Sequence, residues 1–444
     1  TLGEIISNGQ TVELTTQNGC ILDGNGGGVF NITAAMLMAR AALGIALDTA
    51  VSNLDLSTDA GDIELTNTLS TPVTANVSVV GVGVVDLRQN GGGALTVADA
   101  RTGEGDIMLQ VEGANLDARM ITAGGQGNVF LTTTTSGDVL LETVSAVGDT
   151  VNINSIGAVF DALSGEAANL TAATAMIEAV NGVGTGAEDI DTELVSLDAQ
   201  NSGLAGGIFV TELASGGDLN LSARLTNAAG AGHVVVVAEG GRLTVRASGG
   251  GVAVAGSGNV LIDARGAQSD LRLMSNVNVA GGAISLLSAR DAVQGEGVEV
   301  ASGGGTLDVE AMGGSVTMAS TASLASTGGA IRIEAMRDVI LGVVDAGNGG
   351  AQSGWGSVSV TATNGSILET TDATATTTHI LASSLRLNAG NAVGGFDVRD
   401  YRFEFSSNGV DWTPLASIVS ADSTVQFTTP DPGTARAFYR VILP

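Results

Sequence analysis

The chain has 444 residues with 65 Gly, 5 Pro and 3% aromatic residues, so a core built on large rings is not available to it. Its formal net charge is −29 and all 17 basic residues are Arg, which argues against a nucleic-acid or anionic-membrane surface, because both need a basic footprint. The absence of Lys also excludes a Schiff base, a Lys general base and a Walker-type phosphate loop.

The N-terminal residues favour an exported protein. The chain starts at Thr1 rather than Met and shows no cleavable signal peptide, so we expect a processed product or an excised segment. The longest apolar run, 34–47, contains Arg40 and is too short for a bilayer of about 30 Å. We therefore predict a soluble, extracellular or cell-surface protein without membrane insertion. Cys20, the only cysteine, stands beside Ile21 and Leu22 and is interpreted as a small core residue rather than an interchain bridge.

Alternating strands begin at the first residues, with GEIIS and TVELTT, and no amphipathic helix precedes them. The run AAMLMARAALGIAL from residue 34 is ambiguous because it is rich in helix formers. An internal repeat decides between helix and strand. The segment from Cys20 aligns with a segment 138 residues later, so that Asp23 matches Asp161 and Asn31 matches Asn169. After an insertion in the later segment, the match resumes with Asp48 on Asp191. A partial third copy is rich in β-branched residues, so we predict strands in all three, near 20–71, 158–213 and 366–394.

Short strands led by glycine fill the chain between the copies, such as GDIML, GNVFLTT, GDVLLET and GDLNLSA. The leaders GG, GD and GN fit sharp corners, where Gly, Asn and Asp tolerate positive φ. The clearest rhythm lies in 295–347, where strands start at 298, 307 and 316 and, after a longer loop, at 331. Their alternate residues are apolar, with Glu299, Asp308, Thr317 and Arg332 between them. Short strands repeated without helices predict an all-β solenoid over 1–394, a coil of strands stacked on itself.

The composition changes near residue 395. Eight of the 13 aromatic residues and four of the five prolines lie in the last 50 residues. The segment 395–444 predicts a small antiparallel, β-sandwich-like module of four strands with a hairpin at Asn408-Gly409. At about 50 residues it is marginal by itself, so we expect it to dock on the last solenoid turn or to be completed by another chain.

The repeat unit ILDGNGG…NITA…GDIEL and the segment LRLNAGNAVG resemble the filamentous-haemagglutinin-like repeat proteins of bacterial surfaces. The tail SSNGVDWTPL…FYRVILP looks like the small C-terminal β modules of large secreted bacterial proteins. The first resemblance covers residues 1–394 and implies a right-handed parallel β-helix, export, and adhesive or structural duty. The resemblance also implies an N-terminal secretion cap and a terminal outer-membrane barrel, and neither is recognised in residues 1–444.

Candidate chemical residues are few. His233 and His379 lie far apart, each next to a strand, and are interpreted as turn or core residues rather than catalytic ones. The acidic run Glu188-Asp189-Ile190-Asp191 could form a glycosidase-like pair or a calcium site, but it coincides with an insertion and fits a solvated turn. We expect no catalytic residue and no cofactor, with a structural Ca²⁺ ion as the alternative.

Two further sets have a functional and a structural interpretation. Five Asn-x-Ser/Thr sequons are better explained as polar ladder or turn residues than as glycosylation sites: Asn31, Asn76, Asn169, Asn220 and Asn364. Trp355, the only tryptophan before residue 395, could anchor a partner, although a ring lying on the surface is commoner.

The leading hypothesis is a non-enzymatic fibre subunit of a bacterial surface or matrix, which polymerises head to tail through its solenoid ends and its C-terminal module. The alternative is a stalk or passenger segment of an adhesin that binds glycans or cells through loops such as 345–357. A polysaccharide lyase or hydrolase is a remote alternative, because it needs a basic groove that 17 scattered arginines can hardly build.

Overall fold

The structure, a computed structural model, describes residues 1–246, 249–350, 354–370 and 380–394 in full, and the backbone of residues 400–406, 413–419, 424–427 and 438–442. These residues form strands and turns, with no α-helix among them. A helix long and apolar enough to cross a membrane is therefore not found in the described residues. The chain packs as two compact units, 1–213 and 214–444, and each is described by itself.

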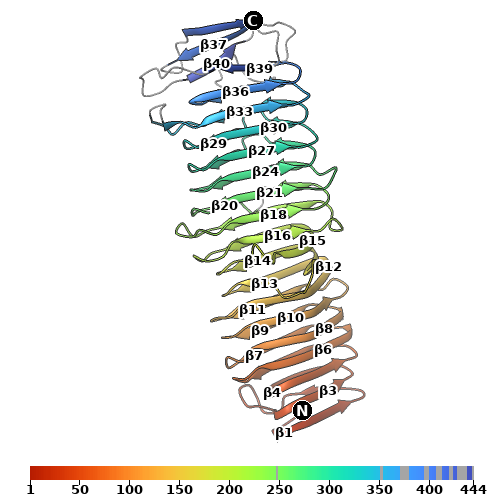
Figure 1. The fold of residues 1–444 in the computed structure, drawn as a ribbon. Helices are drawn as coiled ribbons and strands as arrows, with labels where there is room; N and C mark the ends of the chain where they lie inside the picture. Colours follow the sequence, from red (N-terminus) through yellow and green to blue (C-terminus); the bar gives the residue numbers. More distant parts are fainter. Residues whose placement is uncertain are drawn as a thin grey trace. The chain divides into compact units, whose positions relative to one another are not determined.

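Most of the strands are stacked in parallel within each unit (Figure 1). The strands of the first unit are β1 (Ile5–Thr16), β2 (Cys20–Leu22), β3 (Ile32–Ala41), β4 (Gly44–Thr58), β5 (Ile63–Thr68), β6 (Val73–Val82), β7 (Val85–Asn90), β8 (Leu95–Glu104), β9 (Ile107–Glu112), β10 (Leu116–Ala123), β11 (Val129–Thr134), β12 (Val139–Ser155), β13 (Val159–Asp161), β14 (Leu170–Ala179), β15 (Ile190–Asn201) and β16 (Ile208–Glu212).

The strands of the second unit are β17 (Leu219–Leu225), β18 (Val234–Ala238), β19 (Leu243–Val245), β20 (Val252–Val254), β21 (Val260–Ala264), β22 (Leu271–Leu273), β23 (Val277–Val279), β24 (Ile284–Ser288), β25 (Ala292–Gln294), β26 (Glu299–Ser302), β27 (Leu307–Ala311), β28 (Val316–Met318), β29 (Ser323–Ser326), β30 (Ile331–Ala335), β31 (Val339–Leu341), β32 (Val343–Asp345), β33 (Ser357–Ala362), β34 (Ile367–Glu369), β35 (Ile380–Leu381), β36 (Ser384–Ala389), β37 (Asp400–Ser406), β38 (Thr413–Val419), β39 (Thr424–Phe427) and β40 (Phe438–Ile442).

The first unit contains a regular 22-residue turn. Ile63 pairs in register with Val85, Val85 with Ile107, and Ile107 with Val129, and hydrogen bonds between neighbouring turns join residues 22 apart. All four side chains are buried, so each apolar residue packs on its equivalent one turn away. Parallel in-register stacking thus turns small aliphatic side chains into a continuous core without large rings.

The second unit has three parallel ladders, which pass through β18, β19 and β20 and repeat every third strand. The sequence predicted only short alternating strands here, and it treated the segment before residue 331 as a loop. That interpretation was wrong, because β29 lies in this segment and pairs with β26 and β32. Strands of three or four residues carry too little alternation to be found from the sequence, although a neighbour on each side stabilises them in the solenoid.

The alternation itself is confirmed. In 295–347 the apolar members of the pattern are all buried, namely Val298, Val300, Leu307, Val309, Val316, Met318, Ile331 and Ile333. The ambiguous run 34–47 is also extended apart from a bend at 42–43, since β3 and β4 lie on either side of the bend and pair with each other in parallel register. The preference of the third repeat for β structure therefore predicted the conformation of the first correctly.

Glycines are stacked in a column, here called the glycine ladder, at a corner of the second unit. Its members are Gly258, Gly282, Gly305, Gly329 and Gly356. A Cβ added to any of them would lie between 1.6 and 2.2 Å from the carbonyl oxygen of the glycine one turn earlier. A shorter ladder with corresponding distances of 2.1 to 2.4 Å occurs in the first unit, at Gly83, Gly105 and Gly127. The backbones of neighbouring turns approach so closely that no side chain fits, which explains much of the glycine content.

The late strands pair antiparallel. β37 pairs with β38 and β40, β39 pairs with β36, and β40 meets β35 at Ile380. β39 and β40 thus pair through their backbones with β36 and β35, and docking of a separate module stays a prediction. Their packing into a sandwich-like module stays a prediction, and the Asn408-Gly409 hairpin lies outside the described residues.

Candidate functional site

The internal repeat builds the same polar corner twice. In the first copy, Asn31 donates from Nδ2 to Asp23 Oδ1 at 2.7 Å and accepts the Asp48 amide at 2.9 Å. The hydrogen bond from Asn31 is the main cause that lowers the pKa of Asp23. In the second copy, Asn169 makes the equivalent bonds to Asp161 at 2.6 Å and from the Asp191 amide at 2.9 Å.

Both asparagines are 0% exposed, and each side chain ties one solenoid turn to the next. This confirms the structural interpretation of these two sequons, because an amide that is fully buried in the folded chain is out of reach of a glycosylating enzyme. The other sequons differ: Asn76 and Asn364 are exposed and Asn220 is half-buried. For those three the structural interpretation stays a prediction.

An acidic cluster forms at the second corner. Carboxylate oxygens of Glu166, Asp189 and Asp191 lie within 4.8 Å of one another. The sequence had placed Asp189 and Asp191 together but missed Glu166, which comes from the loop before β14. At the aligned position the first copy has Gly28, whose amide donates to Asp48 at 3.2 Å. Carboxylates are the ligands that Ca²⁺ prefers, so a structural cation here stays a prediction. Glu188 is not part of the cluster.

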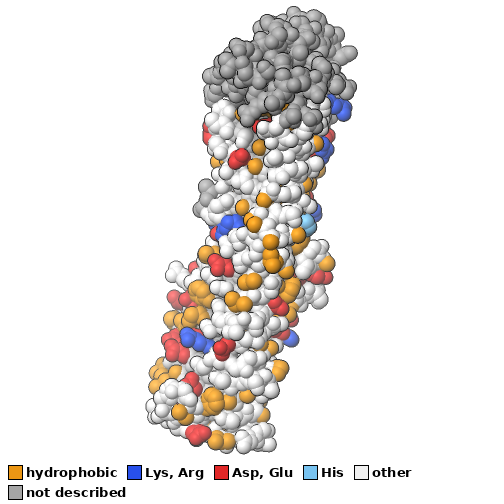
Figure 2. All heavy atoms as spheres, turned by 90° about the vertical axis from the view of Figure 1, so that its left-hand side faces the viewer, with side chains coloured by type: hydrophobic (Ala, Val, Ile, Leu, Met, Phe, Trp, Pro, Cys, Tyr) orange, Lys and Arg blue, Asp and Glu red, His pale blue; other side chains and the backbone are white. Residues whose placement is uncertain are grey.

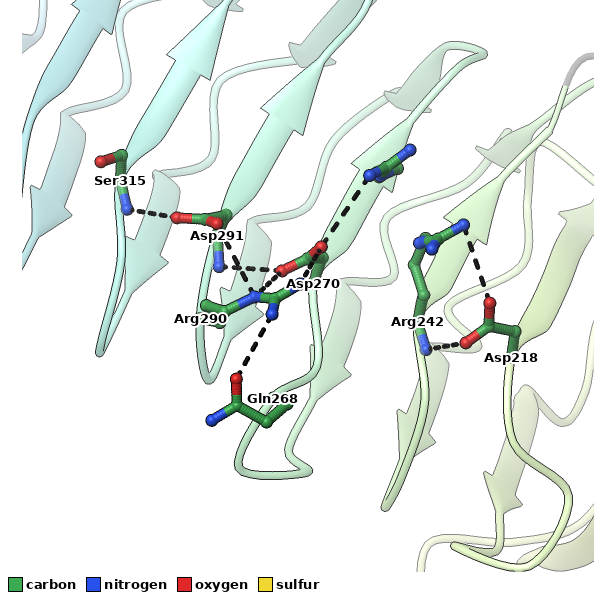
Figure 3. A network of polar contacts seen from close by, with 8 residues as sticks. Asp218, Arg242, Gln268, Asp270, Arg290, Asp291 and Ser315 are labelled. Carbon is green, nitrogen blue, oxygen red and sulfur yellow. Dashed lines mark hydrogen bonds and ion pairs between the residues drawn. The ribbon is translucent and has the colours of Figure 1, made fainter.

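Asp, Asn and His side chains cap backbone N–H groups at corners in both units. Each accepts the backbone N–H of the equivalent residue one turn later: Asp106 that of Asn128, at 2.7 Å, and His233 Nδ1 that of Asn259, at 2.9 Å. The pairs Asp218–Arg242 and Asp291–Ser315 in Figure 3 repeat this arrangement. His233 is therefore a turn residue, as predicted. His379 lies outside the described residues.

These capping bonds correct the reason given for the Gly-Asp and Gly-Asn leaders. Among the described residues, the only one other than Gly with positive φ is Thr135. Asp and Asn are thus favoured at corners because their side chains satisfy a backbone donor, and only the glycines supply positive φ, as at Gly61 and Gly105.

Arginines on the outer faces are held by carboxylates. Arg332 donates to Asp308, Glu310 and Glu334 at 2.7 to 2.9 Å, and the hydrogen bond with Asp308 is the main cause that raises the pKa of its guanidinium. Similar pairs join residues two apart on one strand, Arg88 with Asp86 and Arg119 with Asp117. On the face drawn in Figure 2, basic side chains lie as isolated groups near acidic ones.

An exposed arginine pairs with a buried carboxylate in the network of Figure 3. Arg290 donates to both oxygens of Asp270 at 2.6 and 2.7 Å, and this hydrogen bonding lowers the pKa of the Asp270 carboxyl. Gln268 accepts from the same guanidinium at 3.3 Å, and Asp291 lies 3.7 Å from it. The network joins two successive corners, so its evident role is structural.

The sequence suggested that Trp355 anchors a partner or lies on the surface, and its position in the structure contradicts both interpretations. Its side chain is only 7% exposed, and its Nε1 donates to the carbonyl of Gly350 at 3.2 Å. Asn348 accepts the amide of Gly350 at 2.9 Å and donates to the carbonyl of Gly354 at 3.0 Å. The ring thus anchors its own loop and is not an open platform for a partner. An apolar ring next to glycines needs such a loop to cover it, which local sequence does not reveal.

The interpretation of Cys20 as a core residue was wrong, because its side chain is exposed and its thiol is free. β2 alternates, with Ile21 buried and its two neighbours turned outward. The period of two therefore decided the side on which the cysteine lies, and the apolar neighbours did not.

No protein-family model, curated protein or solved structure matches this chain. The parallel β-solenoid is therefore established by the structure alone. The likeness to filamentous-haemagglutinin-like proteins stays a prediction.

Proposed function

We propose that the chain is a non-enzymatic structural protein of the bacterial surface or extracellular matrix, a fibre subunit that joins copies head to tail. The observation that carries this proposal is the edge of β1. This strand of 12 residues pairs with β3 on one side, and among the described residues no strand pairs with its other side. An open edge of that length is a row of peptide groups ready to pair with another chain.

The backbone amide of Ile6 points away from β3, to the open side of β1. The amide of Ile5 donates to the carbonyl of Asn31 at 2.8 Å, so it points toward β3. Because amides alternate in direction along a strand, the amide of Ile6 points to the open side. Apolar side chains are also exposed at this end of the first unit, namely Ile6, Leu22, Val29 and Phe30. Exposed apolar side chains beside an open edge favour an interaction surface.

The other half of the joint is assigned to the C-terminal strands. β36 pairs with β33 on one side and with β39 on the other, so the last long strand of the ladder has no open edge. We therefore assign contact with the next subunit to β37–β40 rather than to β36. A joint between two different surfaces does not close on itself, and it produces a filament.

Ile6→Pro tests the joint. Proline removes the outward N–H and leaves the bonds to β3 intact, so we expect the variant to fold like the wild type but to stop polymerising. Ile6→Thr keeps both the N–H and a β-branched side chain and is the matched control. Electron microscopy and light scattering are the measurements. A wild-type protein that stays monomeric at high concentration would contradict the proposal.

We further propose that the solenoid is right-handed and that the protein is exported. Its proposed partners are other copies of the chain and surface ligands such as glycans. The net charge of −29 supports solubility and low non-specific association. Pairing of arginines with carboxylates leaves little basic surface for nucleic acid, an anionic membrane or an acidic polysaccharide. This pairing also weighs against the lyase or hydrolase alternative, and we propose no catalytic residue.

The adhesin alternative assigns binding of glycans or cells to the loop 345–357. Asp345 begins this loop, accepting the amide of Gly347 at 2.7 Å, and burial raises the pKa of its carboxyl. Because the Gly356 amide donates to the Ala346 carbonyl at 2.8 Å and so closes the base of the loop, deleting 348–353 should leave β32 and β33 in place. Under the adhesin hypothesis this deletion abolishes adhesion to cells without changing assembly, while under the fibre hypothesis adhesion is unaffected.

A further inference from the structure

A buried amide in the first repeat shows what the solenoid interior requires at one position. Asn67 of β5 is fully buried and accepts from Thr49 Oγ1 at 2.7 Å and from the Val51 amide at 2.9 Å. Its Nδ2 donates to the carbonyl of Val51 at 2.9 Å and to Gln89 at 2.7 Å. The side chain is neutral, and every bond that it makes joins it to an adjacent turn.

The second repeat has a carboxyl in the same surroundings. Glu212 of β16 is 0% exposed, and it accepts from Thr192 Oγ1 at 2.6 Å and from the Leu194 amide at 2.8 Å. The repeat alignment that matches Asp48 with Asp191 also matches Thr49 with Thr192 and Val51 with Leu194. Glu212 therefore replaces Asn67, and an acid stands where the first copy has an amide.

We propose that Glu212 is a protonation-controlled lock on the last turn of the 1–213 unit, in which the neutral acid holds β16 to β15 and the carboxylate loosens this pairing. A neutral carboxyl reproduces the uncharged amide of Asn67, whereas a carboxylate places a full charge in the core. β15 carries Asp191, Glu193 and Asp198, and of these Glu193 acts on Glu212 with a charge of the same sign. Among the described groups that act on the Glu212 carboxyl, no arginine is found.

Burial raises the pKa of Glu212 from 4.5 to about 7, against the lowering effect of the bonds from Thr192 and Leu194. Between these two values the folded chain binds more protons at this group than the unfolded chain does. The stabilisation that Glu212 contributes is therefore complete below pH 4.5, is lost as the pH rises through about 7, and does not return above it.

The experiment is amide hydrogen exchange from pH 5 to pH 8 on the full chain and on Glu212→Gln, which keeps the shape and removes the charge. We expect protection of the β15 and β16 amides in the wild type to fall by about two orders of magnitude relative to the variant over this range. Glu64→Gln, at an exposed position of β5, is the matched control and should follow the wild type.

A second readout needs only the unmodified protein. Protection of β15 and β16 relative to β7 and β9, measured in the same sample, should fall as the pH rises, because the latter strands lie far from Glu212 in sequence and pair elsewhere. Parallel pH profiles for wild type and Glu212→Gln, or a constant ratio between the two pairs of strands, would overturn the proposal.

Discussion

Gly282→Ala is expected to destabilise the second unit by about 3 kcal/mol or more, at or above the upper end of the usual cost of overpacking. The added Cβ would lie 1.8 Å from the carbonyl oxygen of Gly258, and that oxygen belongs to the backbone of the previous turn. A backbone atom cannot rotate away as the end of a side chain can. The whole turn has to shift, and the parallel pairing between β21 and β24 must give way.

Gly281→Ala is a control one residue away. A Cβ there would have its nearest contact at 3.5 Å, which is an ordinary van der Waals distance, and the position is exposed. Chemical unfolding followed by circular dichroism compares the two variants. Because a solenoid can unfold in steps, hydrogen exchange of β21 and β24 serves as a local measurement. Equal stability of the two variants would show that the fold does not depend on the close approach between the backbones of neighbouring turns at these glycines.

Asn169→Ala is expected to cost about 2 to 4 kcal/mol, because it leaves buried polar groups without their partner. The Asp191 amide loses the oxygen to which it donates, and Asp161 loses a donor at 2.6 Å. The carbonyls of Leu141 and Glu142, at 3.3 and 3.2 Å, lose the same amide. The hydrogen bonds of Asn169 link three successive turns, so we expect the loss of stability to extend from β12 to β15.

Asn76→Ala is the matched control, since Asn76 also begins a sequon but is exposed on β6. We expect its effect on the free energy of unfolding to stay within about 0.5 kcal/mol. Thermal and denaturant unfolding of both variants measure the difference. If Asn169→Ala were as stable as Asn76→Ala, the polar corner of the repeat would be dispensable, and another reason for its recurrence would be needed.

The acidic cluster and the Glu212 carboxyl show how two copies of one repeat diverge. At the first corner Gly28 donates an amide to Asp48, whereas the second copy places Glu166 there, next to Asp191. In the interior the neutral Asn67 is replaced by Glu212. Both changes add a carboxyl to the second copy without an added base. We therefore expect the second copy to respond more strongly than the first to pH and to added cations.

The amino-acid sequence by itself determined the longer strands of this protein and the side of these strands that is buried, but it missed β29 and the outward side of Cys20. Alternation of apolar and polar residues is local, so Leu307 and Val309 could be assigned to the core and Asp308 to the surface from their order alone. The repeat likewise predicted the extended conformation of 34–47, because one fold must suit all copies. These inferences needed no knowledge of which strands are neighbours.

Only the tertiary structure decided which residues meet. The capping by His233, the grouping of Glu166 with Asp189 and the replacement of Asn67 by Glu212 all depend on residues at least one turn apart. Turn length varies, since capping bonds span 22 residues at Asp106 and 26 at His233. Each loop insertion shifts the register of everything after it, and a one-residue error turns a buried side chain outward. The physical reason is that alternation is encoded residue by residue, whereas stacking is set by the summed length of loops whose sequence carries no period.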